Sequence, residues 1–245
     1  MTDLQPSWVL GRKNYGDNGM LVEFFSAVDG RCGAIAKGAF RRKPGGNLAA
    51  LLQPFHPLLI KLSGRGELRT LVSAEAPTLG YTLRAESLMS GLYLNELLTR
   101  VLPRFDPHPS LFVFYGETVE ALQTGLPDLA LRRFELVLLK ELGYRVDWAV
   151  DDLGDPILEA ALYRYEAGRG FVAISAAEPL DERQGIRGKS LLYIAQVLQQ
   201  EQAPDSVSLS IMKAVTRSAV SVLTAGRPIH SRSILRSLRK PSTIS

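Results

Sequence analysis

The chain has few of the residues that metal sites and disulfides require. Its 245 residues include one cysteine, Cys32, and three histidines, His56, His108 and His230, which lie far apart. A single cysteine cannot form an internal disulfide, and no group of these residues has the spacing of metal ligands. We therefore expect no metal and no cofactor.

Long hydrophobic runs are also absent. No apolar stretch approaches the roughly 20 residues of a membrane-spanning helix. The opening residues, MTDLQPSWVLGRKNYG, lack the apolar segment and the cleavage site of a signal peptide. We expect a cytoplasmic protein with no membrane partner. A hydrophobic content of 46% suffices for a sizeable core, in one large domain or two modest ones.

Signatures of catalysis are missing too. We find no phosphate-binding loop, nucleophile elbow or dinucleotide-binding motif. The closest acidic cluster, DDLGD, contains Asp151, Asp152 and Asp155 and lacks the spacing and the bidentate glutamate of a calcium loop. We expect a solvated turn and a protein that is not an enzyme. A nuclease that holds a metal ion in this turn is the alternative.

Acidic residues are nearly absent from two segments. Residues 31–69 contain eight Lys or Arg and one acid, a charge of +7, and residues 206–245 contain seven and none, again +7. Because the whole chain carries +4, the remaining segments sum to 4 − 14 = −10. Such segregation is typical of a protein that presents two basic surfaces to a polyanion, although basic loops can also serve solubility alone.

The first 80 residues have the pattern of short strands. Apolar runs occur in SWVLG, in NGMLVEFFSA and in the two halves of HPLLIKLSGRGELRTLVSAEA. The dipeptide Asp29-Gly30 suits a tight hairpin turn. Four or five short strands with basic loops predict a closed barrel of the OB type, which binds single-stranded nucleic acid with a basic groove and stacked aromatics. Phe40 lies within the basic loop, Tyr15 is a second candidate for stacking, and Phe55 is expected in the core.

From residue 81 the period becomes helical. Helices are expected at about 84–102, 110–124, 128–142, 188–202 and 205–225, with Asp128 as an N-cap and Gly143 as a stop. Tyr163–Ile174 reads as a small hairpin, and a last helix is expected after Ser231. The fold class is therefore α+β: an OB-fold barrel at 1–80, then a helical domain at 81–245 with a hairpin subdomain inserted at about 147–178.

Several long blocks carry a resemblance to a known family. The blocks are GRCGAIAKGAFRRK, LQPFHPLLIKLSGRGELRTLVSAEA, SGLYLNELLTRVLP, ALRRFELVLLKELGY and YRYEAGRGF. They resemble, in the same order and over nearly the whole chain, the RecO family of bacterial recombination and repair proteins. The resemblance implies an OB-fold, a helical domain and a small insertion that is a four-cysteine zinc finger in some members. Residues 147–175 contain no cysteine, so this chain resembles the zinc-free members.

The resemblance also implies a mechanism without bond chemistry. Such proteins act in the RecF pathway on the bacterial nucleoid. They bind single- and double-stranded DNA, engage the C-terminal tail of single-strand-binding protein, anneal complementary strands and, with RecR, promote RecA loading at gaps. Basic loops would replace counterions along both phosphate backbones. We assign the DNA contacts to Lys37, Phe40, Arg41, Arg42, Lys43, Arg65, Arg69, Lys213, Arg217, Arg232, Arg236 and Arg239.

The acidic tail of single-strand-binding protein, which ends in an apolar residue and a carboxylate, requires a different site. An apolar pocket beside a guanidinium would suit it. The residues that combine both on one predicted helix are Leu131, Arg132, Arg133, Phe134 and Leu138. The alternatives are that one arginine lies on a solvated face and the other pairs internally with a residue such as Glu96 or Glu135. For the protein as a whole, an RNA-binding OB-fold protein is a further alternative.

Overall fold

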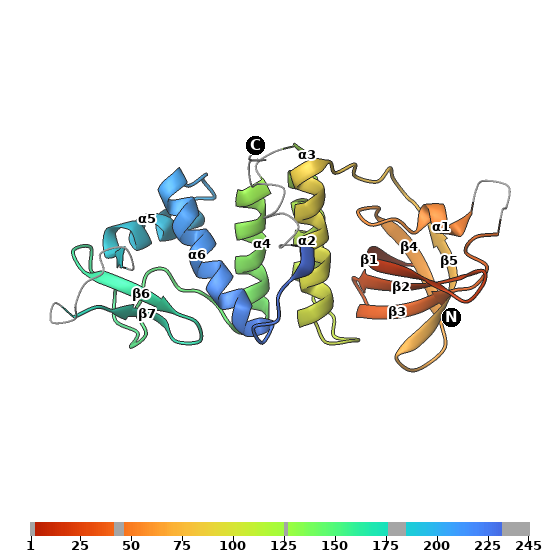
Figure 1. Ribbon diagram of the computed structural model, residues 1–245, viewed down its shortest axis with the longest axis horizontal. Coiled ribbons are helices and arrows are strands. Elements are labelled where there is room, and N and C mark those ends of the chain that lie inside the picture. The colour runs from red at the N-terminus through yellow and green to blue at the C-terminus, as the bar shows by residue number, and fades with distance from the viewer. Residues whose placement is uncertain (1–2, 42–46, 125–126, 176–184, 232–245) are drawn as a thin grey trace, which may run out of the picture. The chain divides into compact units, whose positions relative to one another are not determined.

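The structure is a computed structural model that describes residues 3–41, 47–124, 127–175 and 185–231 (Figure 1). The chain divides into two compact units. The first contains residues 1–127 and 228–245, and the second contains residues 128–227. Within the described ranges, no helix combines the length and the apolar character needed to span a bilayer.

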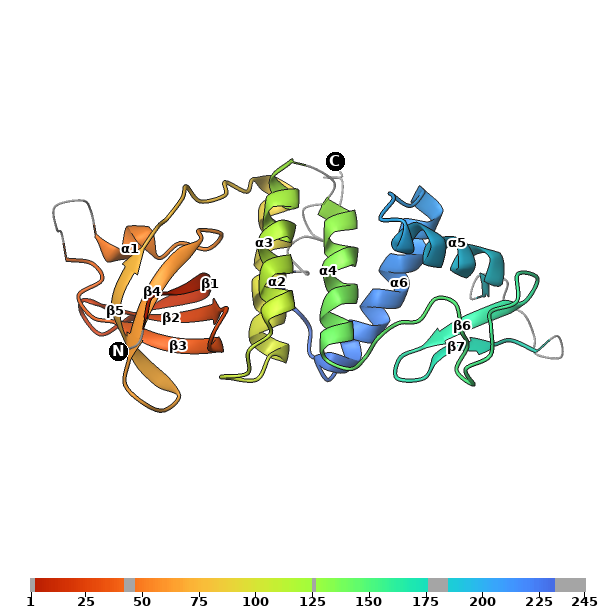
Figure 2. The same ribbon diagram turned by 180° about the vertical axis from the view of Figure 1, so that it is seen from behind.

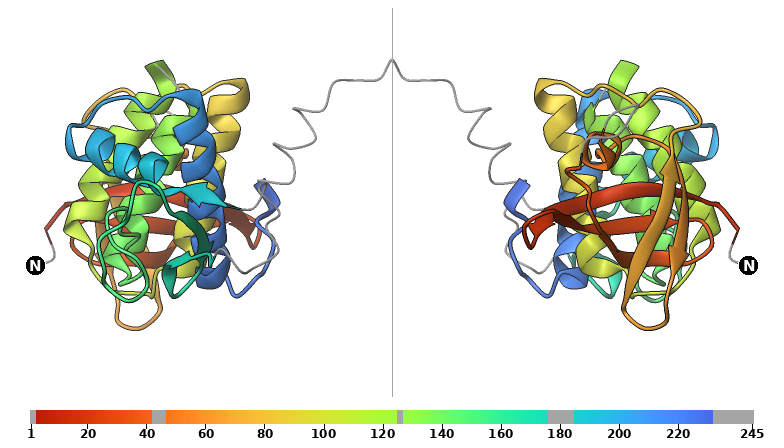
Figure 3. Two further views of the ribbon diagram at one scale, coloured as in Figure 1. Left: turned by 90° about the vertical axis from the view of Figure 1, so that its left-hand side faces the viewer. Right: turned by 90° about the vertical axis from the view of Figure 1, so that its right-hand side faces the viewer.

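The first unit is built on a closed five-stranded barrel. Its strand order is β1-β2-β3-β5-β4, with β4 paired back to β1, and all pairs are antiparallel except β3 with β5. This is the arrangement of an OB-fold, and Figure 3 shows the strands crossing as they wrap around the barrel. A short helix, α1 (Leu48–Leu51), lies between β3 and β4 in sequence. The strands are β1 (Gln5–Tyr15), β2 (Gly19–Ser26), β3 (Gly30–Ala36), β4 (Leu58–Ser63) and β5 (Leu68–Glu75).

Alternation along the strands fills the barrel with apolar side chains. Residues at every second position of β2 and β3 point inward, because successive side chains of a strand face opposite sides. The fully buried residues of the barrel interior include Val22 and Phe24 of β2, Cys32 and Ala34 of β3, and Ile60 of β4. Burial, together with the nearby Asp29, raises the pKa of the Cys32 thiol to about 12. The one cysteine is therefore a core residue with little thiolate character.

Two helices of the first unit pack against the barrel through aromatic rings. They are α2 (Ala85–Val101) and α3 (Pro109–Thr124), and Figure 2 shows them on the same side of the barrel. Trp8 of β1 contacts Tyr115 of α3 with ring centroids 5.4 Å apart, and Phe25 of β2 contacts Phe112 at 5.5 Å. Edge-on contacts of this kind add to the free energy gained from burial.

Asn95 connects these helices to the barrel through hydrogen bonds. Its Nδ2 donates to the carbonyl oxygen of Val9 in β1 at 3.3 Å, and its Oδ1 accepts from the hydroxyl of Tyr115 at 2.5 Å. Burial raises the pKa of Tyr115, opposed in part by the bond to Asn95, so the phenol stays a donor. Asn95 and Tyr93, both on α2, are buried and therefore serve packing.

The β2–β3 turn meets the loop between α2 and α3 at very close range. Gly30 adopts a φ of +64°, and a Cβ added there would lie 2.0 Å from the carbonyl oxygen of Asp106. The backbone N–H of Phe105 also donates to the carbonyl oxygen of Arg31 at 2.9 Å. Glycine is therefore required both for the turn and for this approach.

The second unit combines three helices with a small sheet. The helices are α4 (Pro127–Glu141), α5 (Gly188–Gln199) and α6 (Ser206–Leu223), and the strands, in the order β7-β6-β8, are β6 (Leu162–Glu166), β7 (Gly170–Ala173) and β8 (Ile186–Arg187). The hairpin of β6 and β7 has an aromatic core, in which Trp148 and Tyr165 lie 5.4 Å and 5.2 Å from Phe171. Gly143, at φ +83°, ends α4 as expected.

The predicted fold class is confirmed: a barrel precedes the helices, and a small separate sheet is present. Asp128 lies in the first turn of α4 and not before it, which corrects the expected N-cap. The sequence pattern missed α1 and β8, which have four and two residues. The boundary expected near residue 80 marks the change from strands to helices, and as a limit between domains it stays a prediction.

Candidate nucleic-acid interface

One end of the barrel carries lysine and tyrosine side chains on its outer face. Lys13 of β1 pairs with Leu21 of β2, and Leu21 pairs with Ile35 of β3, which forms a row of outward residues beside the buried row. Tyr15 lies two positions after Lys13 and therefore on the same face. Lys37 follows Ile35 by two positions and is also exposed. The outer face of β1 thus carries Lys13 and Tyr15, and Lys37 lies just after the end of β3.

Gly19 leaves one flank of Tyr15 uncovered. It is the cross-strand partner of Tyr15, and a Cβ there would lie 2.6 Å from the carbonyl oxygen of Tyr15. Because no side chain stands opposite the ring, Tyr15 is 50% exposed. An exposed aromatic beside lysines is the combination with which OB-folds stack bases and hold phosphates.

The turn after β3 adds two of the predicted residues to this end. The N–H of Arg41 donates to the carbonyl oxygen of Gly38 at 3.0 Å, and Gly38 has a φ of +64°. A Cβ on Gly38 would lie 3.2 Å from Cδ of Arg41, so the arginine side chain packs over Gly38. Phe40, in the same turn, is 38% exposed. Arg42 and Lys43 lie outside the described residues.

The other two basic residues predicted in the barrel lie elsewhere. Arg65 is exposed in the β4–β5 turn, which precedes β5. Because β5 runs parallel to β3, with Leu68 paired to Gly33, this turn lies toward the start of β3, whereas Lys37 follows its end. Arg69 pairs with Asp29 at 2.6 Å and its guanidinium lies 4.6 Å from the ring centroid of Phe105. Arg69 therefore fastens the barrel to the α2–α3 loop.

Two further arginines take part in the same junction. Glu23 of β2 accepts from Arg31 at 2.6 Å and from Arg104 of the α2–α3 loop at 2.9 Å. Arg31 also donates to the carbonyl oxygen of Leu102 at 2.8 Å. Arg31 and Arg69, two of the basic residues counted from residue 31 to residue 69, thus have acidic partners within the fold, whereas the exposed Lys37 and Arg41 lie at the Tyr15 end.

The basic residues predicted in the second half of the chain are partly engaged. Lys213 of α6 pairs with Asp128 of α4 at 3.1 Å, and Arg217 is half-buried one turn further. Arg232, Arg236 and Arg239 lie outside the described residues. As DNA contacts, these five residues stay predictions.

The residues predicted for tail binding lie on α4, but their guanidinium groups have internal partners. Arg132 is 3% exposed, pairs with the fully buried Glu135 at 2.9 Å and donates to the hydroxyl of Thr216 at 3.1 Å. Arg133, which is half-buried, donates to the carbonyl oxygens of Glu201 and Gln202 at 2.8 Å and 3.0 Å. The three apolar residues of the set, Leu131, Phe134 and Leu138, are buried.

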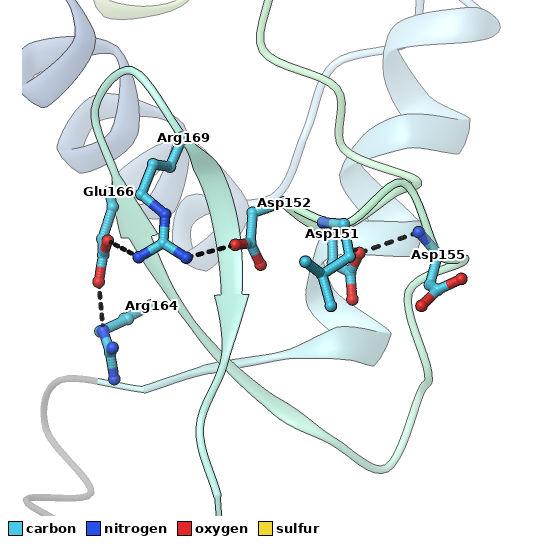
Figure 4. Close-up of polar contacts among 7 residues, drawn as sticks. Asp151, Asp152, Asp155, Arg164, Glu166 and Arg169 are labelled. Carbon is cyan, nitrogen blue, oxygen red and sulfur yellow. Dashed lines mark hydrogen bonds and ion pairs between the residues drawn. The ribbon is translucent and has the colours of Figure 1, made fainter.

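The acidic turn is tied into the hairpin of the second unit (Figure 4). Asp151 Oδ1 accepts from the N–H groups of Leu153 and Asp155, both at 2.9 Å. Asp152 pairs with Arg169 at 2.6 Å, and Arg169 also pairs with Glu166.

The pKa values in this hairpin follow the ion pairs. The hydrogen bond from Arg164 and the charge of Arg169 lower the pKa of Glu166, and the bond to Asp152 raises the pKa of Arg169. These contacts give the acidic turn a structural role. Among the described residues, no group of three His, Cys, Asp or Glu side chains has the arrangement of a metal site.

Lys13 was missed by sequence reasoning, which placed β1 at SWVLG alone. Strand β1 continues to Tyr15 through a bulge between Val9 and Gly11. The alternation of Lys13 and Tyr15 just before Gly16-Asp17-Asn18-Gly19, which has the composition of a turn, is the signal that would have extended the strand.

Fold and site together define an OB-fold protein with a basic, aromatic end on its barrel and a helical continuation. Comparison with known families narrows this class. The family model described as "Recombination protein O N terminal" matches residues 1–78, and the one described as "Recombination protein O C terminal" matches residues 84–233. The chain belongs to the RecO family.

Full-length relatives agree with this assignment. The chain is 39% identical over 238 residues to the DNA repair protein RecO of Alkalilimnicola ehrlichii, covering 97% of this chain and 92% of that protein. It is 39% identical to the DNA repair protein RecO of Sodalis glossinidius, over 96% of this chain and 88% of that protein. It is 37% identical to the DNA repair protein RecO of Yersinia pestis, over 96% of this chain and 95% of that protein. The resemblance noted from the sequence blocks is confirmed.

Proposed function

We propose that this protein is a DNA-binding recombination mediator of DNA repair. It binds single- and double-stranded DNA, anneals complementary strands, engages the C-terminal tail of single-strand-binding protein and, with RecR, promotes RecA loading at gaps. Membership of a family whose relatives are named DNA repair proteins supports this proposal. The observation that carries the DNA-binding part is the set of exposed basic and aromatic side chains at one end of the barrel, Lys13, Tyr15, Lys37, Phe40 and Arg41.

The charges at this end fit a nucleic-acid backbone better than a defined sequence. Exposed lysines and an arginine replace counterions along the phosphates, which reduces the repulsion between strands that are being paired. Phosphate contacts carry no base information, so all sequences should bind about equally. A single strand has the further advantage that its unpaired bases can stack on Tyr15 and Phe40.

Charge removal at the barrel end tests the proposal. We expect a variant with Lys13, Lys37 and Arg41 all changed to Ala to bind single-stranded oligonucleotides more weakly. The slope of log K against log salt should fall by about 2, because each phosphate contact on a single strand contributes about 0.7. A matched control changes three exposed basic residues of the second unit, Lys140, Arg187 and Lys189, to Ala. Equal losses in the two variants, or no loss at the barrel end, would overturn the assignment.

Stacking is tested at Tyr15. Tyr15→Ala should weaken binding of single strands by about 1–3 kcal/mol per stacked base and change duplex binding little, whereas Tyr15→Phe should retain the affinity of the native protein. Fluorescence anisotropy with a labelled single strand, its duplex and an RNA of equal length makes the comparison. Tighter binding of the RNA would favour an RNA-binding protein.

Annealing tests the mediator role itself. Two complementary oligonucleotides are each coated with single-strand-binding protein, with or without its C-terminal tail, and mixed with this protein. We expect tail-dependent annealing that needs neither nucleotide nor metal and that survives Asp152→Ala. Cleavage of the strands that depends on magnesium or manganese and is lost in Asp152→Ala would instead favour the nuclease.

A further inference from the structure

A loop of the second unit holds two leucine side chains in water. Residues 150–159, the leucine loop, precede the hairpin of β6 and β7. Leu153 is 81% exposed and Leu158 is 65% exposed. Leu153 is the most exposed of the large hydrophobic side chains described in this unit. Contact with an apolar partner would remove both side chains from water, which is a favourable change.

Hydrogen bonds fix the backbone of the leucine loop. Val150 and Pro156 form an antiparallel bridge, and the N–H of Asp151 donates to the carbonyl oxygen of Asp155 at 2.8 Å. Asp151 Oδ1 accepts from the N–H of Asp155 at 2.9 Å (Figure 4). Ile157 is buried and holds the loop to the rest of the unit. Because the loop is already ordered, a partner that binds it pays little conformational entropy.

The backbone at Leu158 is fixed on both sides. The N–H of Leu158 donates to the hydroxyl of Tyr163 at 2.9 Å, and the N–H of Lys189 donates to the carbonyl oxygen of Glu159 at 3.1 Å. Gly188 lies so close that a Cβ there would be 1.9 Å from the carbonyl oxygen of Leu158. The main chain is therefore packed against the start of α5, while the leucine side chain remains exposed.

The surroundings of the two leucines carry negative charge. Residues 146–163 contain five acids and no lysine or arginine. Some of these acids are paired with an arginine from outside this stretch, as Asp152 is with Arg169 at 2.6 Å. Asp155 and Glu159 are exposed, and in the part of the chain that the structure describes their carboxylates make no ion pair. The leucine loop thus combines exposed apolar side chains with carboxylates that remain available to a partner.

This combination selects the kind of partner. Nucleic acids and anionic lipid surfaces are negatively charged, so the carboxylates of the loop repel them. A protein surface that places lysine or arginine beside an apolar stripe buries the leucines and pairs the carboxylates at the same time. A basic amphipathic helix has this arrangement, because its apolar residues form one stripe and its cations border that stripe.

We propose that the leucine loop docks a basic amphipathic helix of a partner protein. Leu153 and Leu158 contact the apolar stripe of that helix, and Asp155 and Glu159 pair with its cations. This partner differs from the DNA and from the acidic tail named in the proposed function, because both of those carry the same sign of charge as the loop. The second unit thereby has a protein-binding surface that is separate from the basic end of the barrel.

A model peptide tests this surface. The probe is a fluorescein-labelled peptide of about 18 residues with leucine on one helical face and lysine on the other, and its binding to the full chain is followed by anisotropy. We expect Leu153→Ser combined with Leu158→Ser to weaken binding at least about tenfold, because less apolar area is buried. Asp155→Asn combined with Glu159→Gln should weaken binding and reduce its dependence on salt between about 50 and 200 mM.

Matched variants separate the loop from exposure and charge in general. Leu79→Ser removes a leucine that is 94% exposed in the first unit and should leave the affinity for the peptide unchanged. Glu117→Gln combined with Glu120→Gln removes two exposed acids from α3 and should change it little. Thermal unfolding of each variant shows that it is folded.

Three results would overturn the proposal. The first is a peptide that does not bind, or that binds the double leucine variant as tightly as the native protein. The second is weaker binding of a single-stranded oligonucleotide by the double leucine variant, which would assign the loop to nucleic acid. The third is an oligomer of the native protein, seen by sedimentation, that dissociates in the double leucine variant, since the loop would then bind a second copy of this chain.

Discussion

The buried ion pair of α4 gives the sharpest stability prediction. Glu135 is fully buried and Arg132 is 3% exposed, with 2.9 Å between Nη1 and Oε2. Glu135→Ala leaves the guanidinium in the interior, where it still donates to the hydroxyl of Thr216. Removing one partner of a buried pair costs about 3–5 kcal/mol, because the other charge stays desolvated and uncompensated. For a unit of about 100 residues, this lowers the Tm by at least about 12 °C.

The assay is urea unfolding followed by tryptophan fluorescence. The chain has two tryptophans, Trp8 in the barrel and Trp148 in the second unit, so a Trp8→Phe background leaves one probe in the unit of interest. The double variant Arg132→Met with Glu135→Leu removes both charges at similar volume and should recover most of the lost stability. A cost below about 1 kcal/mol for Glu135→Ala, or a double variant as unstable as the single one, would refute the reasoning.

The same double variant tests the tail site predicted on α4. If Arg132 acts only in the interior, the variant binds a peptide of the single-strand-binding protein tail as well as the native protein does. If Arg132 meets the tail carboxylate, affinity falls although stability is recovered. Arg133→Ala, tested in parallel, removes the more exposed guanidinium of the pair and the bonds to the α5–α6 loop.

Three other predictions concern the first unit. Gly30→Ala should lower the free energy of unfolding of this unit by more than about 2 kcal/mol in urea, because the new Cβ would meet the carbonyl oxygen of Asp106 at a positive φ. Gly64 also has a positive φ, but a Cβ there would have no atom within 4 Å, so Gly64→Ala should cost about 1 kcal/mol. Cys32 should resist maleimide at pH 8 in the folded protein and react fully in denaturant, since its thiol is buried with a pKa of about 12. Burial alone would raise the pKa of Glu96, but the hydrogen bonds from Ser231 and His230 and the charge of Arg100 lower it. The contribution of Glu96 to stability is therefore complete above the ordinary pKa of 4.5 and is lost as the pH falls below that value. Glu96→Gln should reduce the acid sensitivity of the unfolding midpoint of the first unit.

The sequence predicted the elements that have a long and regular pattern. Helix α6 has an apolar stripe at helical spacing over 18 residues, and the helix observed has the expected position. Strand β1 was predicted too short because its last four residues are exposed and polar, so that part of the strand has no apolar alternation. The bulge between Val9 and Gly11 also interrupts the period of two.

The candidate site was harder to predict, because charge in the sequence does not reveal pairing in space. Arg69 and Lys37 looked equivalent in the basic segment. Arg69 finds Asp29, 40 residues earlier, and the ring of Phe105, 36 residues later, whereas Lys37 remains exposed. No local pattern announces such a pair, since each partner is set by the closure of the barrel and by the helix loop that packs on it.

We propose that the positive charge of the first unit serves two tasks, stability of the fold and binding of nucleic acid. At the end of β2 nearest the α2–α3 loop, Arg31 and Arg104 share Glu23, so those guanidinium groups hold the helices to the barrel. At the opposite end of the same strand, Lys13 and Lys37 lie beside Tyr15 without an acid on the neighbouring strand positions, Gly19 and Leu21. Arginine suits the first task because its planar group makes several directed bonds, and lysine suits the second because its mobile charge can follow a strand of any sequence. Exchanging Lys37 for arginine should therefore preserve binding, whereas exchanging Arg31 for lysine should loosen the junction with Leu102 and lower the stability of the first unit.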